Sequence, residues 1–377
     1  MQSLNQISFP TDHELILERI EAINPIKYAQ TRNYLNGRIT YLSPYLSRGF
    51  ISLPQILKSI LKKGYPVKSA EKLIQELAWR EYYQRVWEAK GTQIWDDLKQ
   101  PQHDVAHYSM ISSITKANTG INIIDKEIEI LSEIGFLHNH IRMYLSSIVC
   151  NIGKAHWLTP SKWMYFHLLD GDIASNNCSW QWVAGAFSNK KYYCNQENIN
   201  KYTFSNQTDT FLDTSYEALV DMPIPITLQT TEDIDLNTKL PKTPFPLIDI
   251  NLPTLIYNSY NLDPNWKKEE NVNRILLLEP SHFKAYPVSE KVIEFVINLS
   301  KNITGIQLYV GEINEIVNVY NQGNVAPSEK IISKEHPAFK QYPGIREERE
   351  WMFPSVTGYH PSFFSYWKKC ERILNKL

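Results

Sequence analysis

The chain lacks several features that would place it in a class at once. Its formal net charge is −1 over 377 residues, so it has no basic excess of the kind that coats nucleic acid. No stretch of about 20 apolar residues occurs, and the N-terminus does not combine a charged region with an apolar run as a signal peptide would. We therefore expect a soluble, cytoplasmic protein without a membrane-spanning segment.

Cysteine is also scarce. The four cysteines are Cys150, Cys178, Cys194 and Cys370, and none forms a CxxC pair. This spacing supports neither a disulfide framework nor an iron–sulfur cluster, so we expect free thiols in a reducing compartment and predict no metal site.

Aromatic residues, in contrast, are plentiful, with 10 Trp and 22 Tyr. Such side chains pack in cores, but they also stack on flat ligands such as flavins and nucleobases.

The pattern of apolar residues changes along the chain. From about residue 12 to residue 216 they recur mostly at helical spacing. Six prolines then fall between residues 222 and 253 and predict a long connection. After residue 273, a buried strand over 274–280, a helix near 292–299 and a strand over 305–311 indicate a βαβ unit with parallel strands. We predict a mainly α-helical domain over 1–221, a proline-containing linker over 222–272 and a small α/β domain over 273–377.

Four polar and aromatic segments lie in the helical part. In the first, Glu76, Trp79, Arg80 and Tyr83 share one helix face, which is a poor core stripe. An amphipathic surface helix with an ion pair is the alternative.

The second segment is Gly135-Phe-Leu-His-Asn-His-Ile-Arg-Met143, where Asn139, Arg142 and Met143 share a face. Buried Asn and Arg need hydrogen-bonding partners, which a flavin and its phosphates could supply. A solvated helix face is the alternative, and His138 and His140 could bind metal only with a third ligand that the sequence does not place.

The third segment, Leu169-Asp-Gly-Asp-Ile-Ala-Ser-Asn-Asn-Cys-Ser-Trp-Gln-Trp182, is too polar for a core and too aromatic for an ordinary loop. Asp170 and Asp172 could hold a divalent metal, but that interpretation leaves the neighbouring Asn and Trp residues without a role.

The fourth segment runs from Arg38 to Ser52. Thr40 and Ser43 place hydroxyls just before a predicted helix, where free backbone N–H groups form either an anion site or a structural cap.

In this order and spacing, the four segments resemble the FAD-binding domain of photolyases and cryptochromes, over about residues 28–200. The resemblance implies a helical domain that holds FAD non-covalently, and Asn176 matches the residue that faces flavin N5. The positions that it assigns to FAD are Tyr28, Thr40, Leu42, Ser43, Asn139, Arg142, Asp170, Asp172 and Asn176.

The resemblance also covers the substrate side and is greatest to photolyases that act on cyclobutane pyrimidine dimers. Glu76 matches the carboxyl group that hydrogen-bonds the dimer, Trp79 and Trp182 the stacking indoles, and Met143 a contacting methionine. The implied reaction is light-driven electron donation from reduced FAD to a flipped-out dimer, ring splitting and return of the electron. Relatives acting on (6-4) products usually have paired histidines where this chain has His138-Asn139.

The chain departs from the family in two places. Trp180 and Trp157 match the proximal and middle members of an electron-transfer chain of three tryptophans, but the segment that aligns with the distal member contains no Trp. A nearby tyrosine is an alternative donor. Helical-domain motifs begin near Tyr28, so we expect no N-terminal antenna domain and predict no antenna pigment.

DNA is the expected partner, through local contacts that include Arg80 and His140, with Lys190, Lys191 and Lys201 nearby. The alternatives are a cryptochrome-like blue-light receptor without repair activity and a flavin-binding relative with neither function.

Overall fold

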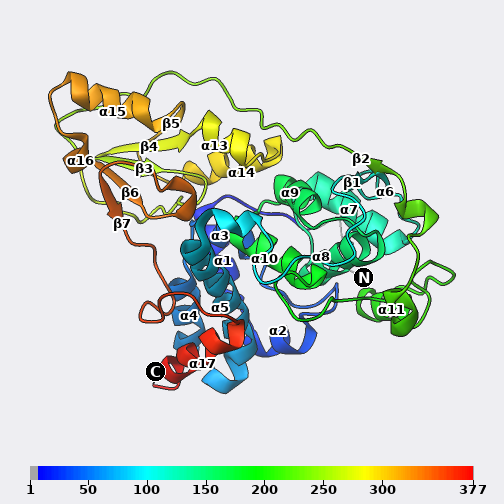
Figure 1. Cartoon of the computed structure of the whole chain (residues 1–377). Helices are drawn as coiled ribbons and strands as arrows, with labels where there is room; N and C mark the ends of the chain where they lie inside the picture. Colours follow the sequence, from blue (N-terminus) through cyan, green and yellow to red (C-terminus); the bar gives the residue numbers. More distant parts are fainter. Residues whose placement is uncertain (1–6, 377) are drawn as a thin grey trace.

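The computed structural model describes residues 7–376. A helical part and an α/β part lie side by side, and the chain returns to the helical part at its C-terminus (Figure 1). One continuous core joins the two parts, since buried residues of both, such as Tyr45 and Phe295, belong to the same cluster. Within the described range, no helix combines the length and the apolar character needed to cross a membrane.

The helical part confirms the prediction of a mainly α-helical domain. Capping residues mark where its helices begin: the Asp12 side chain caps the first helix, and Ser52 and Gln55 form a capping box. Glycines mark where two of them end, since Gly135 and Gly185 adopt the left-handed conformation at the helix C-termini. The helices are α1 (His13–Glu21), α2 (Pro25–Thr31), α3 (Ser43–Ser47), α4 (Leu53–Lys62), α5 (Val67–Lys90), α6 (Ser112–Thr115), α7 (Asn122–Ile134), α8 (Asn139–Ser147), α9 (Leu158–His167), α10 (Ile173–Ala184), α11 (Gln196–Thr203) and α12 (Tyr216–Val220).

Four helices form the frame of the helical part. The long helix α5 packs on α2 and α10, and α10 in turn packs on α8. The helix α5 is buried on several sides, which explains why its apolar residues do not form a single stripe. This frame carries most of the residues that the sequence assigns to FAD and substrate.

The connection between the two parts first stays on the helical part. Its strand β2 (Thr231–Glu232) pairs antiparallel with β1 (Met110–Ile111). The Glu232 carboxylate also accepts a hydrogen bond from Ser112 Oγ at 2.9 Å. From β2 the chain runs on to the sheet (Figure 1).

The α/β part contains a five-stranded parallel sheet in the order β5-β4-β3-β6-β7. The predicted parallel pair with a helix between its strands is confirmed, since β4 and β5 pair in parallel with Leu276 opposite Leu308. The strands are β3 (Thr254–Tyr257), β4 (Asn273–Leu278), β5 (Ile306–Val310), β6 (Ile331–Lys334) and β7 (Ile345–Glu347). The helices are α13 (Pro280–Ala285), α14 (Glu290–Ser300), α15 (Ile313–Gln322) and α16 (Pro327–Lys330).

Two segments differ in place from what the sequence suggests. The strand β3 lies within residues 222–272, the range predicted as a linker, yet it occupies the centre of the sheet and is fully buried. The last helix, α17 (Phe363–Leu374), packs on α5 rather than on the sheet. The limits of the domains stay a prediction.

Candidate functional site

The segment before α10 is held by two ion pairs that reach it from different helices. Nη2 of Arg142, on α8, lies 2.9 Å from both carboxylate oxygens of Asp170, whose side chain is buried. Nη2 of Arg80, on α5, donates to Asp172 Oδ2 at 3.1 Å. These pairs join α5, α8 and the start of α10 into one polar centre.

Asp172 also begins α10. Its Oδ1 accepts the backbone N–H of Ser175 at 2.7 Å, as an N-cap residue does. Its Oδ2 accepts from Gln84 in addition to Arg80. Both carboxylates of the segment, Asp170 and Asp172, therefore have protein donors of their own.

Asn176 lies one turn into α10 and is buried. Its Nδ2 donates to the Ser161 carbonyl at 2.9 Å, which sets the orientation of the amide. Among residues 7–376, no group donates a hydrogen bond to its Oδ1. A free acceptor in this position fits a flavin N–H.

Tyr28, Arg32 and Glu76 form a cluster between α2 and α5. Nη1 of Arg32 lies 2.7 Å from Glu76 Oε1, and both side chains are about a quarter to a third exposed. Burial raises the pKa of the Glu76 carboxyl, while the Arg32 and Lys72 charges act to lower it. Burial, followed by the Glu76 charge, also raises the pKa of the Tyr28 hydroxyl. The carboxyl predicted to bind substrate is thus paired with an arginine that the sequence did not single out.

Trp79 is covered on one face. The ring of Phe363, at the start of α17, stacks on the Trp79 indole with centroids 3.8 Å apart and planes inclined by 10°. Trp182, the other indole predicted to stack on substrate, is 37% exposed and has Tyr192 nearby.

The helix α8 places Asn139 and Met143 one turn apart, with Asn139 Nδ2 4.0 Å from Met143 Sδ. His138 caps this helix, its Nδ1 accepting the backbone N–H of His140 at 3.2 Å. Burial, with smaller effects from His140 and Arg142, lowers the pKa of His138 to about 4.

The His140 ring stacks on Tyr202, and its Nδ1 lies 2.8 Å from the Asn33 carbonyl. In the described part of the chain, no group of three or more His, Cys, Asp or Glu side chains is arranged to hold a metal ion.

The segment with Thr40, Leu42 and Ser43 leads into α3. Thr40 Oγ1 accepts the backbone N–H of Leu42 at 3.4 Å, and no side chain caps the helix start in the part of the chain that the structure describes. The structural cap, one of the two interpretations of this segment, is therefore not observed. Pro44 has no N–H, so among the first three residues of α3 only Ser43 and Tyr45 present backbone N–H groups to an anion.

The two predicted electron-transfer tryptophans are buried in one apolar cluster. Trp157 Nε1 donates to Asp97 at 2.6 Å. Beyond Trp157 the chain offers His156 and then Tyr108, whose ring stacks on His156 at 4.9 Å and is 69% exposed. This row of rings leads from the buried indoles to the surface.

The residues predicted to contact DNA differ in their exposure and in whether they form ion pairs. Arg80 is largely buried against Asp172, and Lys191 pairs with Asp104 at 2.9 Å. His140 is half-buried, whereas Lys190 is exposed. All of these contacts stay predictions. The four cysteines are free and buried, as expected.

Sequence reasoning missed Arg32, Gln84 and Phe363. Arg32 and Gln84 are ordinary polar helix residues in the sequence, and Phe363 lies more than 280 residues from its partner Trp79. Only folding brings these residues to the site.

Part of the chain is similar to known proteins. The family described as the FAD binding domain of DNA photolyase matches residues 73–214. A deoxyribodipyrimidine photo-lyase of Buchnera aphidicola is 28% identical over 224 residues, covering 52% of this chain and 46% of the relative. That of Escherichia coli is 26% identical over 198 residues, covering 48% and 41%. The chain thus spans less than half the length of these relatives.

Among solved structures, a Synechocystis cryptochrome aligns with a TM-score of 0.47 and 22% identity, over 52% of this chain and 44% of that one. A class III photolyase of Agrobacterium tumefaciens aligns with a TM-score of 0.40 and 25% identity, over 46% and 37%.

The helical part is therefore an FAD-binding domain, and its cofactor is FAD. Asn176 with its free acceptor oxygen and the uncapped start of α3 fit that cofactor. This part of the chain is thus similar to the FAD-binding domain of DNA photolyases.

Proposed function

We propose that the protein is a DNA photolyase that repairs cyclobutane pyrimidine dimers under blue light. FAD, when bound, supplies the light-driven electron. Asn176 would face its ring through the free Oδ1, and Arg142 with Asp170 would hold a fixed charge pair beside it. The names of the curated relatives support this activity.

The observation that supports repair activity is that the four predicted substrate-binding residues stand on three helices that pack together. Glu76 and Trp79 stand on α5, Met143 on α8 and Trp182 on α10, and α10 packs on both of the other helices. The three packed helices α5, α8 and α10 thus carry a hydrogen-bonding carboxyl, two indoles and a thioether. These groups fit an extruded pyrimidine pair, which has carbonyl and N–H edges and two flat faces.

DNA would be held by local contacts, because the chain as a whole has no excess positive charge. Exposed Lys190 and half-buried His140 lie near Trp182 and Met143 in sequence and would contact phosphates.

A blue-light receptor without repair activity is the second candidate. Its support is the stacking of Phe363 on Trp79, since this contact ties the C-terminal helix to the proposed substrate side. A change at the flavin could then reach α17 through α5.

The two functions are separated by illumination of the reduced, FAD-loaded full chain with an oligonucleotide that contains one thymine dimer. We expect the dimer to be lost under blue light, and chromatography of the oligonucleotide measures this loss. No light-dependent loss, in a preparation with normal flavin absorbance, would favour the receptor. A preparation without flavin would refute both candidates.

Two variants on α5 test the site. Glu76→Gln should slow repair about tenfold or more, because it removes a charge-assisted hydrogen bond to the dimer, and it should leave FAD content unchanged. Glu71→Gln, on the same helix, is the matched control and should repair at the normal rate. Equal activity of both variants would refute the role given to Glu76.

A further inference from the structure

Four aromatic side chains lie next to one another on α8, on α11 and on the segment after α2. The His140 ring, on α8, stacks on Tyr202 with centroids 4.7 Å apart. Tyr202 lies 5.1 Å from Tyr34, and Tyr34 stacks on Phe204 at 5.5 Å with planes inclined by 26°. We call these residues the four-ring cluster. Apart from His140, none of them has a role in the proposed function.

Two contacts fix the segments that carry the four-ring cluster. The Leu35 backbone N–H donates to the Tyr202 carbonyl at 2.9 Å, which joins the segment after α2 to α11. The Tyr144 hydroxyl donates to Asn198 Oδ1 at 2.7 Å, which joins α8 to α11. Figure 1 shows α11 at the outer edge of the helical part, away from the sheet. The rings are thus held together on the outside of the molecule.

Phe204 has a backbone conformation that an aromatic residue rarely adopts. It ends α11 with a φ of 57°, in the left-handed region, where Gly or Asn is usual. Its side chain is 60% exposed, although the ring lies against Tyr34. Neither the helix end nor the core therefore explains a phenylalanine here. The open face of its ring is available to a flat ligand.

The segments that carry the non-helical part of the cluster are positively charged. Residues 33–38 and 201–205 contain Arg38 and Lys201 and no Asp or Glu. Both cations are exposed, and Lys201 Nζ lies 5.4 Å from the centroid of the Tyr202 ring. Proteins bind unpaired bases and the phosphates between them with this combination of open aromatic faces and neighbouring cations.

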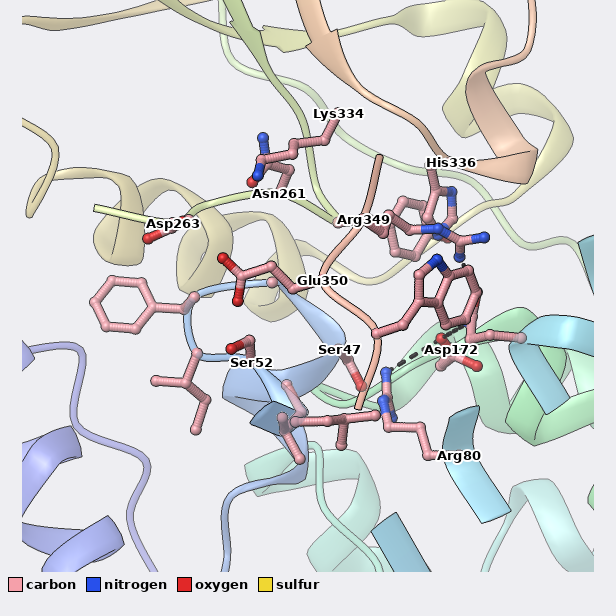
Figure 2. Close-up of a pocket in the computed structure, with 18 of the residues that line it drawn as sticks. Ser47, Ser52, Arg80, Asp172, Asn261, Asp263, Lys334, His336, Arg349 and Glu350 are labelled. Atoms are coloured by element: carbon pink, nitrogen blue, oxygen red, sulfur yellow. Dashed lines mark hydrogen bonds and ion pairs between the residues drawn. The ribbon is translucent and has the colours of Figure 1, made fainter. Parts of the chain in front are cut away.

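The four-ring cluster also lies beside the proposed substrate side. His140 is three residues from Met143 on α8, so the two side chains are neighbours on the helix surface. Arg80, the other residue predicted to contact DNA, is turned inward: it is paired with Asp172 beside a cavity of about 320 Å³ between the sheet and α5 (Figure 2). A DNA strand that leaves the dimer site past α8 would therefore meet the four-ring cluster.

We propose that the four-ring cluster binds unpaired bases of the DNA strand beside the dimer site. A base stacks on the open face of Phe204, and Lys201 and Arg38 contact the phosphates on either side. Because every base has a flat face, the cluster binds without regard to sequence and prefers single-stranded to paired DNA. The choice of DNA as the partner rests on the proposed function, but this binding needs neither light nor a dimer.

The experiment is a fluorescence-anisotropy titration of the FAD-loaded full chain, in the dark, with a labelled and undamaged thymidine oligonucleotide. A length of about 12 nucleotides suits a site of this kind. The same strand paired with its complement is the comparison. The single strand should bind about tenfold more tightly than the duplex, because the bases of a duplex are already stacked on each other.

Phe204→Gly separates binding from folding. Glycine adopts the left-handed conformation without strain, so this variant should be about as stable as the natural chain in thermal unfolding. It should nevertheless bind the single strand about tenfold more weakly. Phe204→Tyr keeps an aromatic ring and should bind normally. Phe245 is 46% exposed and lies beside Tyr309 of the sheet, so Phe245→Ala is the matched control and should not change the affinity.

The proposal is overturned if the single strand does not bind, if the duplex binds as tightly, or if Phe204→Gly binds the single strand as the natural chain does. It is also overturned if size-exclusion chromatography shows that Phe204→Gly separates a dimer into monomers, since the cluster would then join two copies of the chain.

The outcomes for the two proposals are distinguishable. A chain that binds single strands through Phe204 but does not repair dimers refutes the proposed function and leaves this surface intact. A chain that repairs dimers but binds undamaged strands equally with and without the Phe204 ring refutes only the four-ring cluster as a DNA-binding surface.

Discussion

Phe363 lies flat against Trp79, with ring centroids 3.8 Å apart. The contact closes one face of an indole that we expect to stack on a flipped base, and it comes from the last helix of the chain. The same helix is anchored to α5 by Tyr366, whose hydroxyl donates to Glu81 Oε1 at 2.6 Å. The position of α17 should therefore influence access to the proposed substrate side.

Phe363→Ala should uncover this face of Trp79 and raise the rate of dimer repair several-fold at limiting substrate. The neighbouring Phe364 is 65% exposed, so Phe364→Ala is the matched control and should repair at the normal rate. Initial rates under blue light measure the difference. A slower or unchanged rate in Phe363→Ala, with normal FAD content, would show that α17 does not restrict the site.

Arg142→Gln should destabilise the protein by about 1–3 kcal/mol, because it leaves the buried Asp170 carboxylate without its charge partner. Urea unfolding measures the loss. In the double variant Arg142→Gln with Asp170→Asn, part of the stability should return, since no unpaired charge remains. If the double variant is no more stable than the single one, the ion pair is not the cause.

Tyr108→Phe should slow photoreduction of the bound flavin about tenfold or more, as the phenylalanine ring cannot lose a phenolic proton when it gives up an electron. Tyr108 is the exposed end of the row of rings beyond Trp157. Absorbance during illumination with a reductant follows the reaction. The exposed Tyr359 serves as control, and equal effects of Tyr108→Phe and Tyr359→Phe would refute the route through Tyr108.

The stability of the protein should depend on pH through His138. Its pKa is about 4 in the folded chain and about 6.5 in an unfolded one. Between these values the unfolded state binds more protons, so the free energy of unfolding falls as pH decreases from 6.5 to 4, by up to roughly 3 kcal/mol from this residue.

His138→Asn should flatten that decline in urea unfolding at a series of pH values. His103 is exposed, and His103→Asn should leave the slope unchanged. A slope that His138→Asn does not alter would mean that other groups cause the decline.

The helical FAD-binding domain could be predicted from the sequence alone, because the residues that indicate it lie close together along the chain. Asp170, Asp172 and Asn176 lie within seven residues of sequence around the start of α10, and Arg142 and Met143 share one face of α8. Helical periodicity decides such neighbourhoods without knowledge of the fold.

The extent of the sheet was less predictable. The strand β3 is a run of four residues between Pro253 and Asn258, which is too short for periodicity to separate from a loop. Its central place depends on pairing with β4 and with β6, the latter more than 70 residues along the chain. Long-range pairing of this kind leaves little local signal.

The cofactor-binding helices, and the residues on each of their faces, can be predicted from the amino-acid sequence, because a helix face consists of residues three or four apart. The partners of those residues follow from the fold: Arg32 pairs with Glu76, Phe363 stacks on Trp79, and a cavity with apolar and polar lining lies between the sheet and α5. Such contacts join distant segments, so they depend on how whole helices and strands pack.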